Sequence, residues 1–572
     1  MRCLFAVALA LLFTPAAFGQ SLTPAGFKAL GAPHNPSVEV AWNRFYDHDG
    51  LTDIAQKLVA AHPNLATLES IGQSYGGRDL WLLTIANPET GDPDRKTAMW
   101  IDANIHGNEI QGTEVSLYTA WYLLESYDTN PWIKELVDTK TFYILPSQNP
   151  DGRHTFMHED ERSRWSRGGH VPVDDDGDGL VEEDCGNDLD GNGQLTQMRL
   201  KVPGGRWKPN PDEPRQMLRC DPEEACEYDV IFTEGIDDDG DGRVDEDCTS
   251  SYDPNRNWGW FWRPNYIQRG AHHYPFSLPE SKALADFIKA HPNILAGQSY
   301  HNSGGMMLRG PGAAEDQTYR ADDAVFDIIG EKGEQMLPGY NYYVIHSDLY
   351  TVYGGETDWM YASEGIMPFA NELFTSFNLF RSRDRSAGDS YRFDRLLLFG
   401  EFFEDWTPFD HPTYGPVEIG GTKRNFGRIP PSFLIEEELH RNMAFTLYHA
   451  YELPVVTFED VATESLGGGL FEVTATLVNH RAIPTRLAVD VQNGINRPDW
   501  VTLEGATVLS SGTKTSKFAD TYDEQPSRPE RVDVQAVPGQ GRAIVTWIVR
   551  GDGPYTLTYD SLKGGQATHE VR

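Results

Sequence analysis

The stretch KTAMWIDANIHGNEIQGTEVSLYTAWYLLESY, residues 96–127, decides the fold of this chain. Its apolar run AMWIDANI predicts a β-strand, and the part that begins at Glu109 has the apolar spacing of a helix. A second strand-like run, KTFYILPSQNPDG at 140–152, follows this stretch. Residues 65–87, which precede it, are rich in strand-forming residues. Strands that alternate with helices form parallel or mixed sheets, so we predict an α/β domain.

The same pattern extends outward on both sides. Apolar residues at helical spacing from Val40 to about His62 predict a helix that ends at a His-Pro turn. Downstream, the sequence predicts a helix in PESKALADFIKAHPNI at 279–294, a strand at 294–301 and a closing helix at 432–453. Two regions give no clear pattern: 168–251, rich in Asp, Gly and Cys, and roughly 375–440, rich in aromatic residues.

Beyond the closing helix the chain changes character. Short alternating runs between Gly, Pro and Asn turns predict strands, namely PVVTFEDVATES (454–465), GLFEVTATLVNH (469–480), RLAVDVQNG (486–494), AIVTWIVRG (543–551) and PYTLTYDSL (554–562). They indicate a β-sandwich. The predicted fold class is therefore a mixed, mostly parallel sheet flanked by helices, followed by an all-β sandwich. The predicted domains are 20–452, with an insertion at 168–252, and 453–572.

The composition and the N-terminal residues restrict the binding partners and the cellular location that we expect for the protein. An apolar fraction of 39% excludes disorder across the whole chain. The balance of 86 acidic and 48 basic residues gives a net charge of −38, which disfavours nucleic acid and anionic membranes as partners. The start, MRCLFAVALALLFTPAAFGQ, predicts a signal peptide at 1–19 and hence a secreted or periplasmic protein without a membrane span.

His106 and Glu109 lie where the strand AMWIDANI meets the following helix, so both side chains can project from one sheet edge. Zinc accepts imidazole nitrogen and carboxylate oxygen, and catalytic zinc sites commonly use three protein ligands. The His-x-x-Glu pair alone is weak, because a strand-end histidine near a helix N-terminal acid gives the same pattern without binding a metal.

An ordered set of motifs downstream strengthens the zinc interpretation. The set consists of NPDG (149–152), Arg167, DPNRNW (253–258), SYH (299–301), LYTVYGGETDWMY (349–361) and FANEL (369–373). Together with HGNE it resembles the M14 zinc carboxypeptidases over roughly residues 40–450. The resemblance implies that His106, Glu109 and His301 hold one catalytic Zn²⁺.

The resemblance also implies roles for other matched positions. Glu372 matches the general base, which deprotonates the zinc-activated water and then protonates the leaving amine. Arg167 matches the arginine that stabilises the oxyanion, with Arg162 and Arg164 as nearby rivals. Asn255, Arg256 and Tyr350 match the residues that grip the terminal carboxylate of the substrate, with Tyr353 as a rival of Tyr350. This grip favours removal of C-terminal residues over internal cleavage.

Two departures from the pancreatic-type members concern specificity. Asn108 stands where those members carry an arginine, so the chain is more similar to the regulatory branch, which also has a β-domain after the catalytic one. Thr357 occupies the position that helps to set side-chain specificity. Its neighbour Glu356 either favours basic residues or points to solvent.

The insertion contains a repeat. VDDDGDGLVEEDC (173–185) recurs as IDDDGDGRVDEDC (236–248), and DLDGNGQLT (188–196) is a weaker copy. Asp at loop positions 1, 3 and 5 with Gly at 6 suits structural Ca²⁺, although no copy has the Glu that calcium loops carry at position 12. The alternative is a solvated acidic loop. The predicted calcium ligands are Asp174, Asp176, Asp178, Asp237, Asp239 and Asp241.

The cysteines left after signal cleavage all lie in this insertion. Their matching places suggest that Cys185 bonds Cys248, which leaves Cys220 with Cys226, although four cysteines allow three connectivities.

Three functions follow as hypotheses. The first is a secreted zinc carboxypeptidase that acts on peptides or proteins with a free C-terminus. The second is an endopeptidase or amidase of the same fold that acts on peptidoglycan stem peptides. The third is an inactive calcium-dependent surface-binding protein in which the β-domain, whose ligand is unknown, does the work.

Overall fold

The computed structural model describes residues 30–33, 35–158, 166–174, 179–181, 185–231, 233–238, 240, 252–383, 388–424 and 427–571. Several predictions fall outside these residues. They are the signal peptide at 1–19, the rival arginines Arg162 and Arg164, the calcium ligands Asp176, Asp178, Asp239 and Asp241, and Cys248.

A mixed sheet forms the centre of the α/β part, with the strand order β1-β2-β4-β3-β9-β12-β10-β11. Its strands are β1 Ala66–Gln73, β2 Asp79–Ile85, β3 Thr97–Ala103, β4 Lys140–Leu145, β9 Ile294–Asn302, β10 Met306–Arg309, β11 Asn341–Val344 and β12 Met367–Leu373. The middle strands β4, β3, β9 and β12 are parallel to one another. Every residue of β3, β4 and β9 is buried, as expected for parallel strands that are covered on both faces of the sheet.

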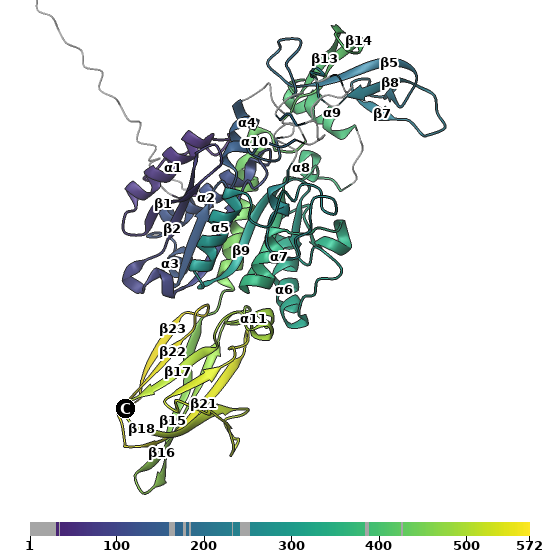
Figure 1. Ribbon diagram of the computed structural model, residues 1–572. Helices are drawn as coiled ribbons and strands as arrows, with labels where there is room; N and C mark the ends of the chain where they lie inside the picture. Colours follow the sequence, from purple (N-terminus) through teal and green to yellow (C-terminus); the bar gives the residue numbers. More distant parts are fainter. Residues whose placement is uncertain are drawn as a thin grey trace, which may run out of the picture.

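Helices cover both faces of this sheet (Figure 1). Their bounds are α1 His48–Ala61, α2 Gln111–Ser126, α3 Pro131–Thr139, α4 Pro150–His158, α5 Pro279–Ala290, α6 Arg320–Met336, α7 Glu356–Glu364, α8 Phe377–Phe380, α9 Asp389–Phe393 and α10 Ser432–Tyr451. Met99 and Ile101 of β3 share a core with α1, α2, α6 and α10. The alternate residues Ala98 and Trp100 share the second core with α5 and α7.

The first helix begins later than the sequence predicted. We expected it from Val40, but α1 begins at His48. The Asp47 side chain accepts a hydrogen bond from Gly50 N at 2.8 Å, which satisfies an amide at the start of the helix. This cap, rather than the apolar spacing upstream, sets the boundary.

The two regions without a clear pattern pair with each other. Their strands form an antiparallel sheet in the order β13-β14-β5-β8-β6-β7. The strands are β5 Gln197–Gly205, β6 Trp207–Pro209, β7 Met217–Arg219, β8 Cys226–Ile231, β13 Phe403–His411 and β14 Gly415–Thr422. β14 pairs with β5, which joins segments some 200 residues apart in sequence. We call this sheet the shared sheet.

The chain from Val456 to Val571 forms further antiparallel sheets, as predicted. One has the order β15-β16-β21-β18-β19 and the other β20-β17-β22-β23. Their strands are β15 Val456–Gly467, β16 Leu470–Asn479, β17 Asp499–Glu504, β18 Thr507–Lys514, β19 Asp523–Glu524, β20 Arg531–Val534, β21 Arg542–Arg550, β22 Tyr555–Asp560 and β23 Gln566–Val571. Buried residues of both sheets, among them Trp547 and Leu557, form one core.

One predicted strand in this part is wrong. RLAVDVQNG contains the helix α11 Ala488–Asn493. Asp322 of α6 accepts hydrogen bonds from Ala488 N at 2.7 Å and Val489 N at 2.9 Å, at the start of α11. A carboxylate from the α/β part therefore stabilises this helix and fixes the β part against it.

Figure 1 shows the shared sheet and the C-terminal sheets at opposite ends of the α/β part. Short 3₁₀ and π turns complete the fold at Pro88–Thr90, Pro93–Arg95, Pro254–Arg256, Ile345–Leu349 and Asp394–Leu398. Among the residues that the structure describes, no helix is both long and apolar enough to cross a lipid bilayer.

Candidate active site

The polar side chains of the site come from one edge of the central sheet. His106 and Glu109 follow β3, and His301 lies near the end of β9. Glu372, near the end of β12, is the register partner of His301. In open α/β sheets, ligands bind outside the carboxyl ends of parallel strands, and these residues lie at that edge.

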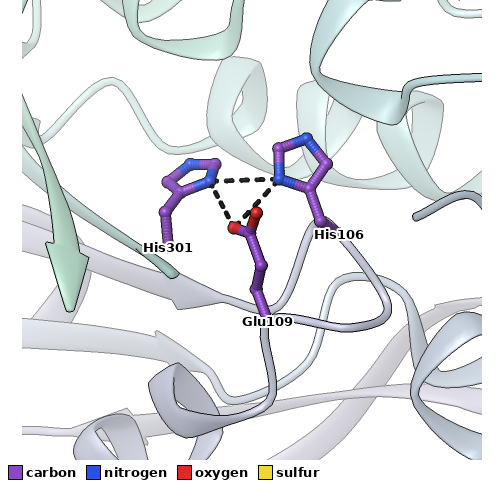
Figure 2. A group of neighbouring side chains, drawn as sticks. All are labelled: His106, Glu109 and His301. Atoms are coloured by element: carbon purple, nitrogen blue, oxygen red, sulfur yellow. Dashed lines mark hydrogen bonds and ion pairs between the residues drawn. The ribbon is translucent and has the colours of Figure 1, made fainter. Parts of the chain in front are cut away.

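His106, Glu109 and His301 converge on one point (Figure 2). Glu109 Oε2 lies 3.0 Å from the Nδ1 atoms of both His106 and His301, and these two nitrogens lie 3.3 Å apart. All three side chains are buried. Two imidazole nitrogens and one carboxylate oxygen brought together in this way fit a zinc ion. A strand-end histidine beside a helix acid would not bring a third ligand from a separate strand.

Asp253 contacts both His106, a predicted metal ligand, and Arg167. Its Oδ1 lies 2.9 Å from His106 Nε2, the ring nitrogen opposite the converging Nδ1. Its Oδ2 accepts a hydrogen bond from Arg167 Nε at 2.8 Å. Burial alone would raise the pKa of Asp253, but Arg167, Arg256 and His106 outweigh burial and hold that pKa well below its usual range. A charged carboxylate of this kind fixes the orientation of a ligand histidine.

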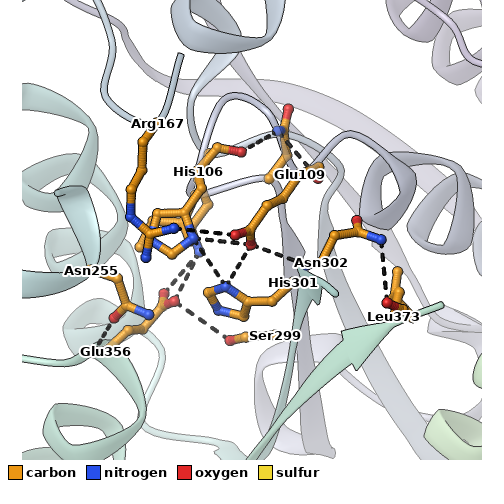
Figure 3. Close-up of polar contacts among 12 residues, drawn as sticks. His106, Glu109, Arg167, Asn255, Ser299, His301, Asn302, Glu356 and Leu373 are labelled. Atoms are coloured by element: carbon orange, nitrogen blue, oxygen red, sulfur yellow. Dashed lines mark hydrogen bonds and ion pairs between the residues drawn. The ribbon is translucent and has the colours of Figure 1, made fainter. Parts of the chain in front are cut away.

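Two arginines approach the other oxygen of Glu109. Arg167 Nη1 lies 3.3 Å from Glu109 Oε1, as Figure 3 shows. Arg428 Nη1 lies 3.1 Å from the same oxygen and donates to Asn302 O at 2.8 Å. Arg428 follows β14 in the chain, so the shared sheet helps to position it at the site.

The sequence interpretation missed the roles of Asp253 and Arg428. Asp253 is the first residue of the DPNRNW motif, and its place in that motif was the only feature of the sequence that pointed to a role. Arg428 lies in the region without a clear pattern, and nothing in the sequence relates it to Glu109.

A pocket that is partly open to solvent lies against these residues. Its lining combines His106, His301, Glu372 and Arg167 with the predicted carboxylate-binding residues Asn255, Arg256 and Tyr350. Thr357 and several apolar residues, among them Ile345, Leu349 and Val352, complete the wall. The predicted catalytic and carboxylate-binding residues therefore lie around one cavity.

The carboxylate-binding candidates differ in exposure and in their hydrogen-bond partners. Arg256 is buried, and its Nη1 donates to Asn255 O at 2.6 Å. Asn255 Oδ1 accepts from Glu356 N at 2.9 Å, which leaves the amide nitrogen as the group for an incoming carboxylate. Tyr350 is 57% exposed and lines the pocket. Its rival Tyr353 does not line the pocket, and its hydroxyl lies 3.5 Å from Glu315.

Glu372 lines the pocket beside His106 and His301, two of the predicted metal ligands. Burial, followed by the nearby Glu109 carboxylate, raises the pKa of Glu372 to about 7, although His301, Arg167 and Arg428 act in the opposite direction. A carboxyl group with a pKa near neutrality is suited to accept and return a proton.

Glu356 lies elsewhere than the sequence interpretation placed it. It is 1% exposed and does not line the pocket. Gln148 Nε2 donates to both of its oxygens, at 2.9 and 3.1 Å. Burial and the nearby Asp102 raise the pKa of Glu356 well above its usual range. Glu356 therefore neither faces solvent nor lies in the wall of the pocket.

The predicted calcium ligands are described only in part. Asp174 Oδ2 accepts from Gly179 N at 3.1 Å, and Asp237 Oδ1 accepts from Gly240 N at 2.7 Å. Both carboxylates therefore cap turns of their own loops. The disulfide Cys220–Cys226 is confirmed, with a Cα–Cα distance of 6.5 Å. Cys185 is also disulfide-bonded, while its predicted partner Cys248 lies outside the described residues.

Comparison with known proteins bears directly on this arrangement. The model of the zinc carboxypeptidase family, Peptidase_M14, matches residues 51–194 and 210–383, which together carry every residue of the proposed zinc site. The chain belongs to this family. A second model, of a domain of unknown function (DUF8731), matches residues 455–572.

Individual relatives of the family match shorter parts. Human carboxypeptidase D is 33% identical over 140 residues, which is 24% of this chain and 10% of that protein. A zinc carboxypeptidase from Saccharothrix mutabilis subsp. capreolus is 35% identical over 123 residues, or 22% of this chain and 27% of the relative. The solved carboxypeptidase A from Helicoverpa armigera gives a TM-score of 0.45 at 16% identity, over 73% of this chain and 76% of that structure.

Proposed function

We propose that the protein is a zinc-dependent carboxypeptidase that releases C-terminal residues from peptides. One observation carries the proposal: a single pocket is lined by the metal-ligand histidines, Glu372 and Arg167 and also by Asn255 and Arg256. If Asn255 and Arg256 held the terminal carboxylate of a peptide, its final peptide bond would lie next to the metal-ligand histidines, Glu372 and Arg167.

His106, Glu109 and His301 are the residues that would hold the zinc ion. When bound, zinc supplies Lewis acidity that lowers the pKa of a water molecule and polarises a carbonyl. Asp253 orients the His106 ring by accepting from its Nε2. Arg428 and Arg167 lie next to Glu109 Oε1 and limit its freedom to rotate.

Glu372 is the proton carrier of the proposed reaction. Its carboxylate accepts a proton from the attacking water and then donates that proton to the amine that leaves. Arg167 offers a fixed positive charge to the oxyanion that develops on the scissile carbonyl. Its Nε remains bound to Asp253, so the guanidinium is oriented before the substrate arrives.

Arg256, Asn255 and Tyr350 determine which peptide bond is cleaved. The buried Arg256 guanidinium and the Asn255 amide are donors suited to a carboxylate. Tyr350 would close over the bound residue from the rim. Thr357 and the apolar wall would contact the released side chain, and the Asp358 side chain also lines the pocket beside Thr357.

The wider setting of the reaction is also part of the proposal. The predicted signal peptide supports export, and peptides or proteins with a free C-terminus are the proposed substrates. Calcium in the two DDDGDG strings stays a prediction, because four of the six ligands lie outside the described residues.

The test uses N-blocked dipeptides and measures released amino acid. Replacing the free carboxylate by an amide should slow hydrolysis about 10- to 150-fold, because charge-assisted hydrogen bonds worth about 1.5–3 kcal/mol are lost. Equal rates on both substrates would instead favour the stem-peptide endopeptidase or amidase. Glu372→Gln should abolish turnover while zinc stays bound, whereas Glu331→Gln, an exposed residue of α6, should have no effect. No release by the zinc-loaded wild type would favour the inactive binding protein.

A further inference from the structure

A buried carboxylate outside the active site has an oxygen without a partner. Glu234 is 0% exposed, and its Oε1 accepts a hydrogen bond from Thr196 N at 2.9 Å. Among the described residues, Glu234 Oε2 has no hydrogen-bond partner. A buried unpaired carboxylate oxygen is costly, so its presence calls for a ligand.

Two further carboxylates lie beside Glu234. One oxygen each of Asp188, Asp190 and Glu234 lies within 4.8 Å of the other two. Because the three groups repel one another, the arrangement gains stability from a cation between them.

Asp188 and Asp190 belong to the string DLDGNGQLT, the weak third copy of the acidic repeat. Asp188, Asp190 and Asn192 occupy loop positions 1, 3 and 5, and Gly193 at position 6 has φ +77°, which favours glycine. Asp188 accepts from Asn192 N at 3.0 Å and from Gly193 N at 2.8 Å, so the loop turns around its carboxylate. Gln194 holds position 7, which supplies a backbone carbonyl in calcium loops.

The string lacks the position-12 glutamate of such loops. Arg199 stands there, and its Nε donates to Glu418 at 2.6 Å, so it cannot act as a ligand. Glu234 comes instead from the chain segment after β8. Backbone hydrogen bonds fix its place: Glu234 N donates to Thr196 O at 3.2 Å, and Asn187 N donates to Glu234 O at 3.0 Å.

We propose that Asp188, Asp190 and Glu234 form a Ca²⁺ site, a calcium loop whose last carboxylate is supplied by a distant part of the chain. Several hard oxygen donors in an irregular, partly exposed loop suit Ca²⁺ better than Mg²⁺, which demands near-octahedral geometry. The site is separate from the zinc centre and does not depend on the proposed peptidase activity. It joins the loop before β5 to the segment after β8.

The test counts calcium ions. Wild type and variants, loaded with zinc and depleted of calcium, are titrated with Ca²⁺ by calorimetry. Glu234→Gln and Asp190→Asn should each lose one equivalent of bound calcium or bind it at least about tenfold more weakly. Glu223→Gln, an exposed glutamate of the same insertion, removes the same charge and should bind as many ions as wild type.

Differential scanning calorimetry gives a second readout. Added Ca²⁺ should raise the melting temperature of wild type more than that of Asp190→Asn, whose exposed position makes misfolding of the variant a minor concern. Unchanged stoichiometry and affinity in both site variants would overturn the proposal. So would a loss confined to Glu234→Gln, because Asp190 would then not be a ligand.

Discussion

Asp253→Asn isolates the contribution of one buried charge to the active site. The substitution keeps the size and shape of the side chain. Its oxygen can still accept from Asn255 N, which now donates to Asp253 Oδ1 at 2.9 Å. The charge that binds both His106 and Arg167 is lost, and the amide nitrogen replaces the oxygen that accepts from Arg167 Nε.

The size of the effect follows from these contacts. At least one charge-assisted hydrogen bond disappears, worth about 1.5–3 kcal/mol. That free energy corresponds to a loss of about 10- to 150-fold in kcat/KM if it acts on the transition state. Asp253 Oδ1 still faces His106 Nε2 in the variant, but loss of the negative charge beside His106 should also weaken zinc binding, by about 10- to 100-fold for a typical ligand-orienting carboxylate.

The assay combines release of amino acid from N-blocked dipeptides with the zinc content of the dialysed protein. Asp286→Asn is the matched control. It removes the same charge from α5, where Asp286 pairs with exposed Lys282, and such surface pairs contribute little. If Asp253→Asn retained wild-type kcat/KM and wild-type zinc affinity, the reasoning that Asp253 positions His106 and Arg167 would be refuted.

Three further predictions concern other parts of the molecule. Arg428→Gln should weaken zinc retention and lower kcat/KM about tenfold, because Glu109 Oε1 loses a charged donor; equal zinc content after dialysis would contradict this role. Tyr350→Phe should lower kcat/KM about tenfold on substrates with a free carboxylate, whereas Tyr353→Phe should leave it unchanged. Lys140 donates to Pro454 O at 2.6 Å, and burial, aided by Arg481, lowers its pKa from 10.5 to about 7. Between these two pH values the unfolded chain binds more protons at this lysine than the folded protein, so the lysine makes the free energy of unfolding rise with pH. The melting temperature of wild type should therefore rise relative to that of Lys140→Met between pH 7 and pH 9.5, and parallel curves would refute the assignment.

The sequence predicted those parts of the fold whose signals are local. The strand β3 contains the apolar run AMWI and β9 begins with the apolar run ILA, and α2 and α10 have helical spacing, so the predicted central α/β arrangement was confirmed. The start of α11 depends on a hydrogen bond to Asp322, which lies more than 160 residues earlier in the chain. Without that contact, the sequence LAVDVQN resembles a strand. The shared sheet was not predicted, because its strands pair across two regions with little periodicity of their own.

The candidate site shows the same limit. His106 and Glu109 are recognisable because both ligands lie in one short motif, and the ordered motifs downstream supply the other candidates. Arg428 and Glu234 differ, since each reaches its neighbours only through strand pairing or a loop contact distant in sequence. Their residue types are ordinary for a chain with 86 acidic and 48 basic residues, so composition gives no signal.

The shared sheet has a practical consequence for anyone who wishes to shorten this protein. Excision of residues 186–252 would remove β5 to β8 and leave β14 paired only with β13. The freed edge of β14 would present a row of unsatisfied backbone amides and carbonyls, which invites pairing between molecules and insoluble expression. The cut would also loosen the chain that carries Arg428 to Glu109. A minimal enzyme should therefore be sought by trimming loops within the sheet rather than by deleting the segment as a whole.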